Sequence, residues 1–139
     1  MKNPLIILAW MIILSCQPIP EGFNPEDYKN QNIEGIIQVS AKLSSEIKDK
    51  RFLTVSVRDL SEPAPIAVLN VKDPSFPYRF KIDGKNKIDH DRPLKGKVII
   101  LARLSSEQGT TAKTGDLMGS AEAIAGQRNV LIIISTRLD

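Results

Sequence analysis

The only histidine of the sequence, His90, is the side chain best suited to acid–base or metal chemistry. It lies between two carboxylates, Asp89 and Asp91, and imidazole is a common ligand of metal ions and of haem iron. Adjacent residues of an extended chain point to opposite faces, so these three groups do not converge on one ligand. The surrounding stretch is polar, and we interpret His90 as a solvated loop residue. We therefore expect no metal site and no cofactor.

The serines and glycines that could support catalysis lack the partners that catalysis requires. Ser44-Ser45 and Ser105-Ser106 have no histidine base nearby in the sequence. Residues 109–119 contain glycines but match neither the Walker pattern nor the dinucleotide-binding pattern. No spacing of ligand residues fits a zinc or calcium site. We expect no catalytic residue and a protein that is not an enzyme.

The only cysteine, Cys16, follows the features of an export signal. Residues 1–4 carry one positive charge, and the unbroken apolar run Leu5–Leu14 comes next. A helix of that length spans roughly 15 Å, about half of the hydrocarbon core of a bilayer. Such a segment is too short for a stable transmembrane helix and is typical of a signal peptide.

Residues 13–16, Ile-Leu-Ser-Cys, resemble the lipobox of bacterial lipoproteins. The resemblance implies that residues 1–15 are removed as a signal peptide and that acyl chains on Cys16 enter the lipid bilayer. Lipidation also removes a lone thiol that would be a liability in an oxidising compartment. An ordinary cleaved signal with an incidental cysteine, or an uncleaved anchor, is the alternative. Gln17 does not decide between the inner and the outer membrane.

The composition is ordinary for one globular domain preceded by a targeting segment. Charged residues make up 25% and hydrophobic residues 42% of the 139 residues. The net charge of +3 is small, and basic residues are interleaved with acidic ones rather than forming a block. Aromatic residues, at 5%, are too scarce for a base-stacking platform. We expect no nucleic-acid partner.

The chain after Cys16 divides into a tether and a β-rich domain. Residues 16–31 contain prolines and polar residues with little periodicity, which predicts a tether. Residues 32–139 show short β-type runs separated by turn signals, which predicts one folded domain. The predicted strands are residues 33–40, 53–58, 66–71, 76–83, 97–104, 117–124 and 130–136.

About seven short strands and no strong helix predict an all-β fold, an antiparallel immunoglobulin-like sandwich. The tryptophan and disulfide that mark antibody domains are missing from the predicted domain. Pro77 cannot donate to a strand ladder, which predicts an edge or strand-start position. The run of apolar residues 98–102 predicts a central strand, because both of its faces are apolar.

Four motifs in a fixed order resemble one known family. They are Pro65-Ile66-Ala67-Val68, Phe76-Pro77, Ala102-Arg103-Leu104-Ser105 and Gly115-Asp116-Leu117-Met118-Gly119. This pattern is similar to the C-terminal periplasmic domain of the CycH-type cytochrome c maturation protein, over about residues 32–139. The resemblance implies an immunoglobulin-like domain in System I assembly of c-type cytochromes. There, the family member helps to hand apocytochrome c to the haem-ligation machinery. Fuller members carry transmembrane helices and a tetratricopeptide region ahead of this domain, and here a lipid anchor is expected in their place.

The last motif and the arginine before it are candidates for contact with a partner protein. These candidates are Arg103, Gly115, Asp116, Leu117 and Gly119. The same residues also fit a structural role. Glycines permit a positive φ at the end of a hairpin, and Asp116 can accept backbone N–H groups in an Asx-type turn. Arg103 is then either a solvated charge at the end of a strand or the ion-pair partner of Asp116.

The function we expect is an accessory protein-binding factor in c-type cytochrome biogenesis. The domain would be lipid-anchored in the cell envelope and would face the periplasm, with apocytochrome c or haem-ligation proteins as partners. The alternative is a generic envelope lipoprotein with a structural or secretion-chaperone role, like the YbaY/YscW-type lipoproteins. A third hypothesis is a small-ligand or metal-binding module that uses His90.

Overall fold

The computed structural model describes residues 25–139. The predicted signal peptide at residues 1–15, the predicted lipidation site Cys16 and the tether up to residue 24 lie outside the described residues. Within the described part, no helix has both the length and the apolar character needed to cross a membrane.

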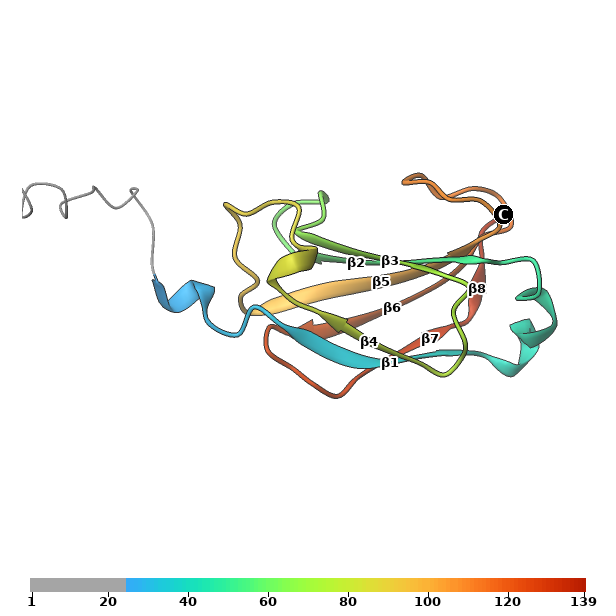
Figure 1. Cartoon of the computed structure of the whole chain (residues 1–139), viewed down its shortest axis with the longest axis horizontal. Helices are drawn as coiled ribbons and strands as arrows, with labels where there is room; N and C mark the ends of the chain where they lie inside the picture. The colour runs from blue at the N-terminus through green and yellow to red at the C-terminus, as the bar shows by residue number, and fades with distance from the viewer. Residues whose placement is uncertain (1–24) are drawn as a thin grey trace, which may run out of the picture.

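Two β-sheets packed face to face make up the domain, which confirms the predicted immunoglobulin-like sandwich (Figure 1). The three-stranded sheet has the order β4 (Tyr78–Ile82), β1 (Ile33–Val39) and β7 (Val130–Ile134). The five-stranded sheet has the order β3 (Ala67–Lys72), β2 (Phe52–Asp59), β5 (Lys97–Ser105), β6 (Leu117–Ile124) and β8 (Thr136–Arg137). Three short 3₁₀ helices occur in the connections: η1 (Pro25–Tyr28), η2 (Ala41–Glu46) and η3 (Gly84–Asn86).

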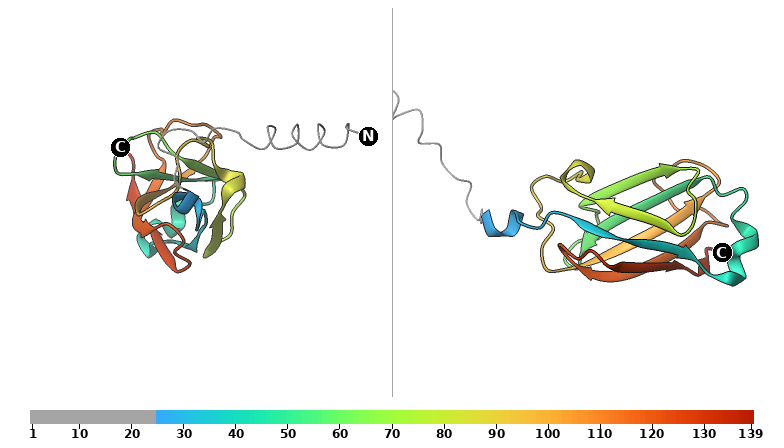
Figure 2. Two further views of the ribbon diagram at one scale, coloured as in Figure 1. Left: turned by 90° about the vertical axis from the view of Figure 1, so that its left-hand side faces the viewer. Right: turned by 60° about the horizontal axis from the view of Figure 1, so that its bottom comes forward.

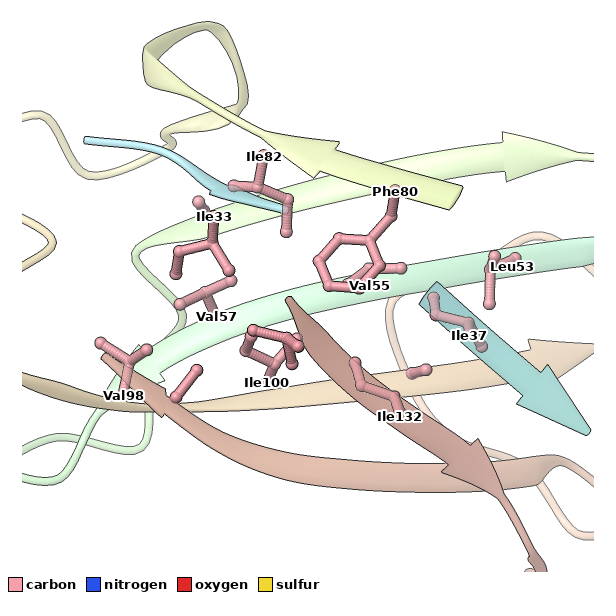
Figure 3. Close-up of a cluster of buried hydrophobic side chains, with 14 of the residues drawn as sticks. Ile33, Ile37, Leu53, Val55, Val57, Phe80, Ile82, Val98, Ile100 and Ile132 are labelled. Atoms are coloured by element: carbon pink, nitrogen blue, oxygen red, sulfur yellow. The ribbon is translucent and has the colours of Figure 1, made fainter. Parts of the chain in front are cut away.

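The core lies between the two sheets and follows from the period-two alternation of the strands (Figure 3). In β4, Phe80 and Ile82 are buried, whereas Arg79 and Lys81, which alternate with them, are exposed. Each large apolar side chain buried in this way stabilises the fold by about 1.5–3 kcal/mol. The side chains that meet across the layers in Figure 3 are Ile33, Ile37, Phe80, Ile82 and Ile132 on one sheet and Leu53, Val55, Val57, Val98 and Ile100 on the other.

Two positional predictions are confirmed. Strand β4 starts directly after Pro77 and is an edge strand, so the missing N–H of the proline interrupts no ladder inside a sheet. Strand β5 lies at the centre of the five-stranded sheet, between β2 and β6. Its inward residues are fully buried, and its outward residues Ile99 and Leu101 are half-buried.

The last predicted strand behaves differently from the expectation. The run from residue 130 to residue 136 splits into β7, in the three-stranded sheet, and β8, in the five-stranded sheet. Strand β7 also pairs in parallel with β1, with Gly35 opposite Val130 and Val39 opposite Ile134, so the sandwich is not wholly antiparallel. Strands β1 and β7 start at the same end of the sandwich and therefore run in the same direction. This crossing between sheets closes one side of the sandwich.

The two ends of the sandwich carry different segments (Figures 1 and 2). We call one the tether end: it carries residues 25–31 and the loops 60–66, 83–96 and 125–129. The opposite, far end carries η2, the β5–β6 loop at residues 106–116 and the C-terminus.

Residues 25–31, predicted as the last part of the tether, are attached to the loop 83–96. The side chain of Gln31 donates to the carbonyl of Leu94 at 2.8 Å and accepts from the N–H of Leu94 at 2.9 Å. Asp27 forms an ion pair with Lys95 at 3.1 Å. The ordered contacts of the domain therefore reach back before Asn32, to the residue Asp27.

Candidate functional site: a groove across the five-stranded sheet

The outer face of the five-stranded sheet carries both apolar and polar side chains, which come from four strands. Strand register places outward-facing residues in three rows, of which two cross β3, β2, β5 and β6 and the third crosses β2, β5 and β6. From the far end to the tether end, the rows are Asn70, Thr54, Arg103 and Met118; Val68, Ser56, Leu101 and Ser120; and Arg58, Ile99 and Glu122. The apolar members of these rows share one face of the sheet, although they are up to about fifty residues apart in sequence.

A groove of about 370 Å³ runs over this face. Val68, Ile99, Leu101 and Met118 make its floor largely apolar, and Thr54 and Ser56 of β2 add hydroxyl groups to it. Pro63, Pro65 and Ile88 line it toward the tether end, and Gly109, Thr110 and Ala112 of the loop 106–116 line it toward the far end. A cleft of this size with an apolar floor and a few polar groups is typical of a site that takes a small number of side chains.

Two arginines line the groove, and only Arg58, near the end of β2, is without an acidic partner. Within residues 25–139, no carboxylate lies at ion-pair distance from its guanidinium. Glu122, in the same row, is paired with Lys97 at 3.7 Å. An arginine without an acidic partner beside an apolar floor favours a ligand that brings its own carboxylate.

The wall at the far end is held in place by Arg103. Its Nη2 donates to the carbonyl of Gly109 at 2.7 Å, and its Nη1 donates to the carbonyl of Thr111 at 3.3 Å. Nη1 also donates to Ser105 Oγ at 2.8 Å and to Asp116 Oδ2 at 3.2 Å. Because the guanidinium is planar and carries five donors, one side chain attaches two points of the loop to the sheet.

Asp116 balances the buried charge of Arg103. The exposed fractions of the two side chains are 5% and 7%, respectively. Burial acts to raise the pKa of Asp116, but hydrogen bonds from the backbone N–H of Lys113, from Ser105 and from Arg103 outweigh it and lower that pKa below its usual value. The carboxylate is therefore ionised when it meets the guanidinium. This geometry matches the structural alternative for the motif, an Arg103–Asp116 pair with backbone N–H donation to Asp116.

The other residues of the motif are also placed in structural positions. Leu117 is fully buried in the core. Gly115 has a φ of 93°, which a glycine adopts without strain. Gly119 lies against the backbone of β7, and a Cβ at this position would overlap the carbonyl of Ile133. Because Arg103, Asp116 and Leu117 are buried, they shape the loop 106–116 rather than offer side chains to a partner; contact with a partner through that loop stays a prediction.

His90 is exposed in the loop 83–96, as expected for a solvated histidine. Among the described residues, it belongs to no group of three or more candidate metal ligands.

Sequence reasoning missed the groove itself. Its floor residues Ile99 and Leu101 were visible only as the second face of an apolar run, which also fits a strand covered on both sides. The predicted number of layers could have identified them. In a sandwich of only two sheets, one face of β5 must point away from the core. Arg58 carried no signal in the sequence, because only the pairing of the neighbouring charges shows that it has no acidic partner.

A second hollow, of about 490 Å³, lies on the outer face of the three-stranded sheet. Ile36 and Leu131 contribute apolar surface to it, and Arg79, Lys81 and Arg128 contribute positive charge. It lacks walls from projecting loops of the kind that bound the groove, because strand residues and the turn at 128–129 line it.

Comparison with known proteins gives one family match and two similar proteins. The family model of the cytochrome c-type biogenesis protein H Ig-like domain matches residues 33–135. An uncharacterized protein of Aquifex aeolicus (strain VF5) is 39% identical over 139 residues, which cover 94% of this chain and 93% of that protein. A solved structure, an alternative pilotin from the type II secretion system of Vibrio cholerae, is 17% identical with a TM-score of 0.45, over 76% of this chain and 95% of that chain.

The family match covers the strands from β1 to β7 and contains all four motifs that carried the resemblance in the sequence. It includes the floor of the groove, Arg58 and the Arg103–Asp116 pair. The chain therefore belongs to the family of immunoglobulin-like domains of cytochrome c-type biogenesis protein H.

Proposed function

We propose that this protein is an accessory protein-binding factor in the biogenesis of c-type cytochromes, held in the cell envelope by a lipid anchor on Cys16. The observation that carries the proposal is the family match over residues 33–135. The groove on the five-stranded sheet supplies a surface with the size and chemistry for a protein ligand.

The ligand that fits the groove is an extended segment of a partner protein with apolar side chains and a carboxylate. The apolar side chains would cover Ile99, Leu101 and Val68, which are half-buried and gain from further removal from water. The carboxylate would pair with Arg58. Apocytochrome c and the proteins of haem ligation are the partners that the family membership favours.

The lipid anchor places this binding surface near the membrane. Cys16 lies outside the described residues, and its lipidation is supported by the lipobox-like residues 13–16. Two acyl chains give stable attachment to a bilayer. With the domain on the periplasmic side, the protein would meet secreted apocytochromes in the compartment where thiols and haem are joined.

The test is a haem stain of c-type cytochromes in a strain that lacks the gene, grown where these cytochromes are required. The expected result is a loss of holocytochromes that the wild-type gene restores and a Cys16→Ala form does not. Unchanged holocytochromes in the deletion strain would refute the maturation role and would leave a general envelope protein with the same fold.

A pair of surface variants separates the groove from the rest of the domain. Leu101→Lys places a charge on the groove floor, at an outward position where the side chain reaches solvent without unfolding the core. Ile133→Lys places the same charge at an outward position of β7 that is 45% exposed and outside the groove. We expect Leu101→Lys to fail to restore holocytochromes and Ile133→Lys to restore them. Full restoration by both variants, at equal protein levels, would remove the groove from the proposal.

A further inference from the structure

Three large, exposed apolar residues lie at the tether end of the sandwich. Leu60 is 58% exposed, Ile88 is 60% exposed and Ile124 is 62% exposed. Among the large hydrophobic residues of the described range 25–139, these three have the highest exposed fractions. Single exposed apolar residues are ordinary, but three at one end of an elongated domain form a pattern.

Strand register and backbone contacts place these residues at that end. Leu60 directly follows β2, whose last residue pairs with Val98 near the start of β5. Ile124 is the last residue of β6 and pairs with Lys97, the first residue of β5. Ile88 donates its N–H to the carbonyl of Ile66, just before β3, at 2.9 Å. All three therefore lie where the strands of the five-stranded sheet start or stop at the tether end.

The chain enters the domain at the same end. The contacts of Asp27 with Lys95 and of Gln31 with Leu94 attach residues 25–31 to the loop 83–96. That loop also carries Ile88. In Figure 1, η1 and this loop lie together at the left of the molecule, and the β5–β6 loop and the C-terminus lie at the right.

The length of chain between Cys16 and this entry point limits how the domain can lie on a membrane. Residues 16–24 reach at most about 30 Å when fully extended. A strand as long as β5 also spans about 30 Å. The far end can touch a bilayer only if the tether is fully extended along the domain, whereas the tether end reaches it in most tether conformations.

We propose that the tether end docks on the bilayer, with the side chains of Leu60, Ile88 and Ile124 in the interfacial region of the phospholipids. The proposal rests on the lipid anchor of the proposed function and adds an orientation to it. A fluid bilayer accepts separate apolar side chains on different loops, whereas a protein partner requires a continuous, shape-complementary patch. The side chains alone bind weakly, but the anchor makes their contact with lipid intramolecular and raises its effective concentration.

Ion pairs within the domain compensate part of the positive charge around the three residues. Lys97 pairs with Glu122, and Lys95 pairs with Asp27, so these cations are already compensated. Arg92 pairs with Asp59 at 3.1 Å beside Leu60. Arg58 and Lys85, at the same end, form no ion pair among residues 25–139, so they would add attraction to acidic phospholipid to the apolar contact.

The experiment uses the processed lipoprotein, purified from membranes and reconstituted into vesicles of phosphatidylethanolamine and phosphatidylglycerol. Because Cys16 is the only cysteine, acylation leaves an introduced cysteine as the one free thiol. Leu60→Cys, Ile88→Cys, Ile124→Cys and the control Ile133→Cys are each labelled with a fluorophore, and quenching by lipid-borne nitroxide is measured. Ile133 is exposed like the others but lies on the outer face of the three-stranded sheet.

We expect several-fold stronger quenching at positions 60, 88 and 124 than at position 133. Equal, weak quenching at all four positions in protein that floats with the vesicles would overturn the docking surface while leaving the anchor intact. Protein that does not float, and whose Cys16 reacts with the label, would refute the anchor itself, and the docking surface would fall with it.

Two double variants that introduce negative charge complete the test. With the reporter at Ile124→Cys, the pair Leu60→Glu/Ile88→Glu is expected to abolish the quenching, and the matched pair Leu131→Glu/Ile133→Glu is expected to preserve it. All four positions are 45–60% exposed, so none of these changes places a charge in the core. Quenching that survives in the Leu60→Glu/Ile88→Glu pair would overturn the proposal.

Discussion

Arg103 and Asp116 form an ion pair at 3.2 Å that is almost entirely shielded from solvent, although it lies on the outer face of a sheet. The shield is the loop 106–116, which Arg103 itself holds through the carbonyls of Gly109 and Thr111. The pair and the loop therefore depend on one another. The far wall of the groove exists only while this interaction is intact.

Removing the arginine should destabilise the domain strongly. Arg103→Met leaves the carboxylate of Asp116 buried without its cation, which costs about 3–5 kcal/mol in the free energy of unfolding. Urea unfolding followed by circular dichroism measures this loss. Arg51→Met is the matched control, because Arg51 pairs with Asp73 where both side chains are more than half exposed, and its loss should change the midpoint little. A similar loss in both variants would contradict the role of burial.

The same pair makes stability depend on pH in a defined direction. The pKa of Asp116 is lowered in the folded state from a reference value of 3.8, so folding favours the ionised form. Its contribution is fully present above the unfolded value and is lost as the pH falls through the lowered folded value. The difference in unfolding free energy between wild type and Asp116→Asn should therefore be constant near neutral pH and should shrink below about pH 4. A difference that grows on acidification would contradict this assignment.

The contact between β6 and β7 should not tolerate a side chain at position 119. A Cβ on Gly119 would overlap the carbonyl of Ile133 and lie 2.9 Å from the Cα of Ile134. Gly119→Ala should cost about 1–3 kcal/mol or more, because one of the two backbones must move. Gly109→Ala is the control, since no atom lies within 4 Å of its added Cβ. Thermal unfolding of the two variants measures the difference, and equal midpoints would show that β6 and β7 are not packed this closely.

The attachment of residues 25–31 should depend on Gln31. Gln31→Ala removes both partners of the Leu94 backbone and the acceptor of Lys87 Nζ at 3.3 Å, and burial already lowers the pKa of Lys87. We expect a loss of about 1–3 kcal/mol in local stability. Hydrogen exchange of the Leu94 amide should accelerate by the corresponding factor. In the control Gln38→Ala, an exposed glutamine of β1 is changed, and exchange at Leu94 should stay as in the wild type.

The groove cation should matter for function rather than for stability. Arg58 has no acidic partner among the described residues, so Arg58→Glu breaks no ion pair there but reverses the charge offered to a ligand. We expect normal protein levels and reduced holocytochromes in a haem stain. Arg79→Glu, an exposed reversal on β4 outside the groove, should leave holocytochromes unchanged. Equal effects of the two reversals would point to net charge rather than to the groove.

Much of the architecture could be predicted from local patterns. The alternation of residues 78–82 predicted a strand with one buried face, and Pro77 predicted its edge position. The apolar run 98–102 predicted the central strand. The motif around Asp116 was interpreted as a hairpin end, and the ion pair with Asp116 was one of the two alternatives predicted for Arg103. These features are local, because periodicity and backbone restrictions act within a few residues.

Other features could not be predicted, because they depend on which distant segments meet. Strand periodicity does not indicate a partner, so the parallel pairing of β1 with β7 and the passage of the chain into β8 became visible only in the assembled sheets. The groove is of the same kind: only strand register brings Val68, Leu101 and Met118 onto one face of the sheet. Local patterns in the sequence were enough to predict most strands, their buried faces and the family. The tertiary structure decided which charges are buried, which arginine is left without a partner and which apolar residues share one end, because each of these depends on contacts between distant parts of the chain.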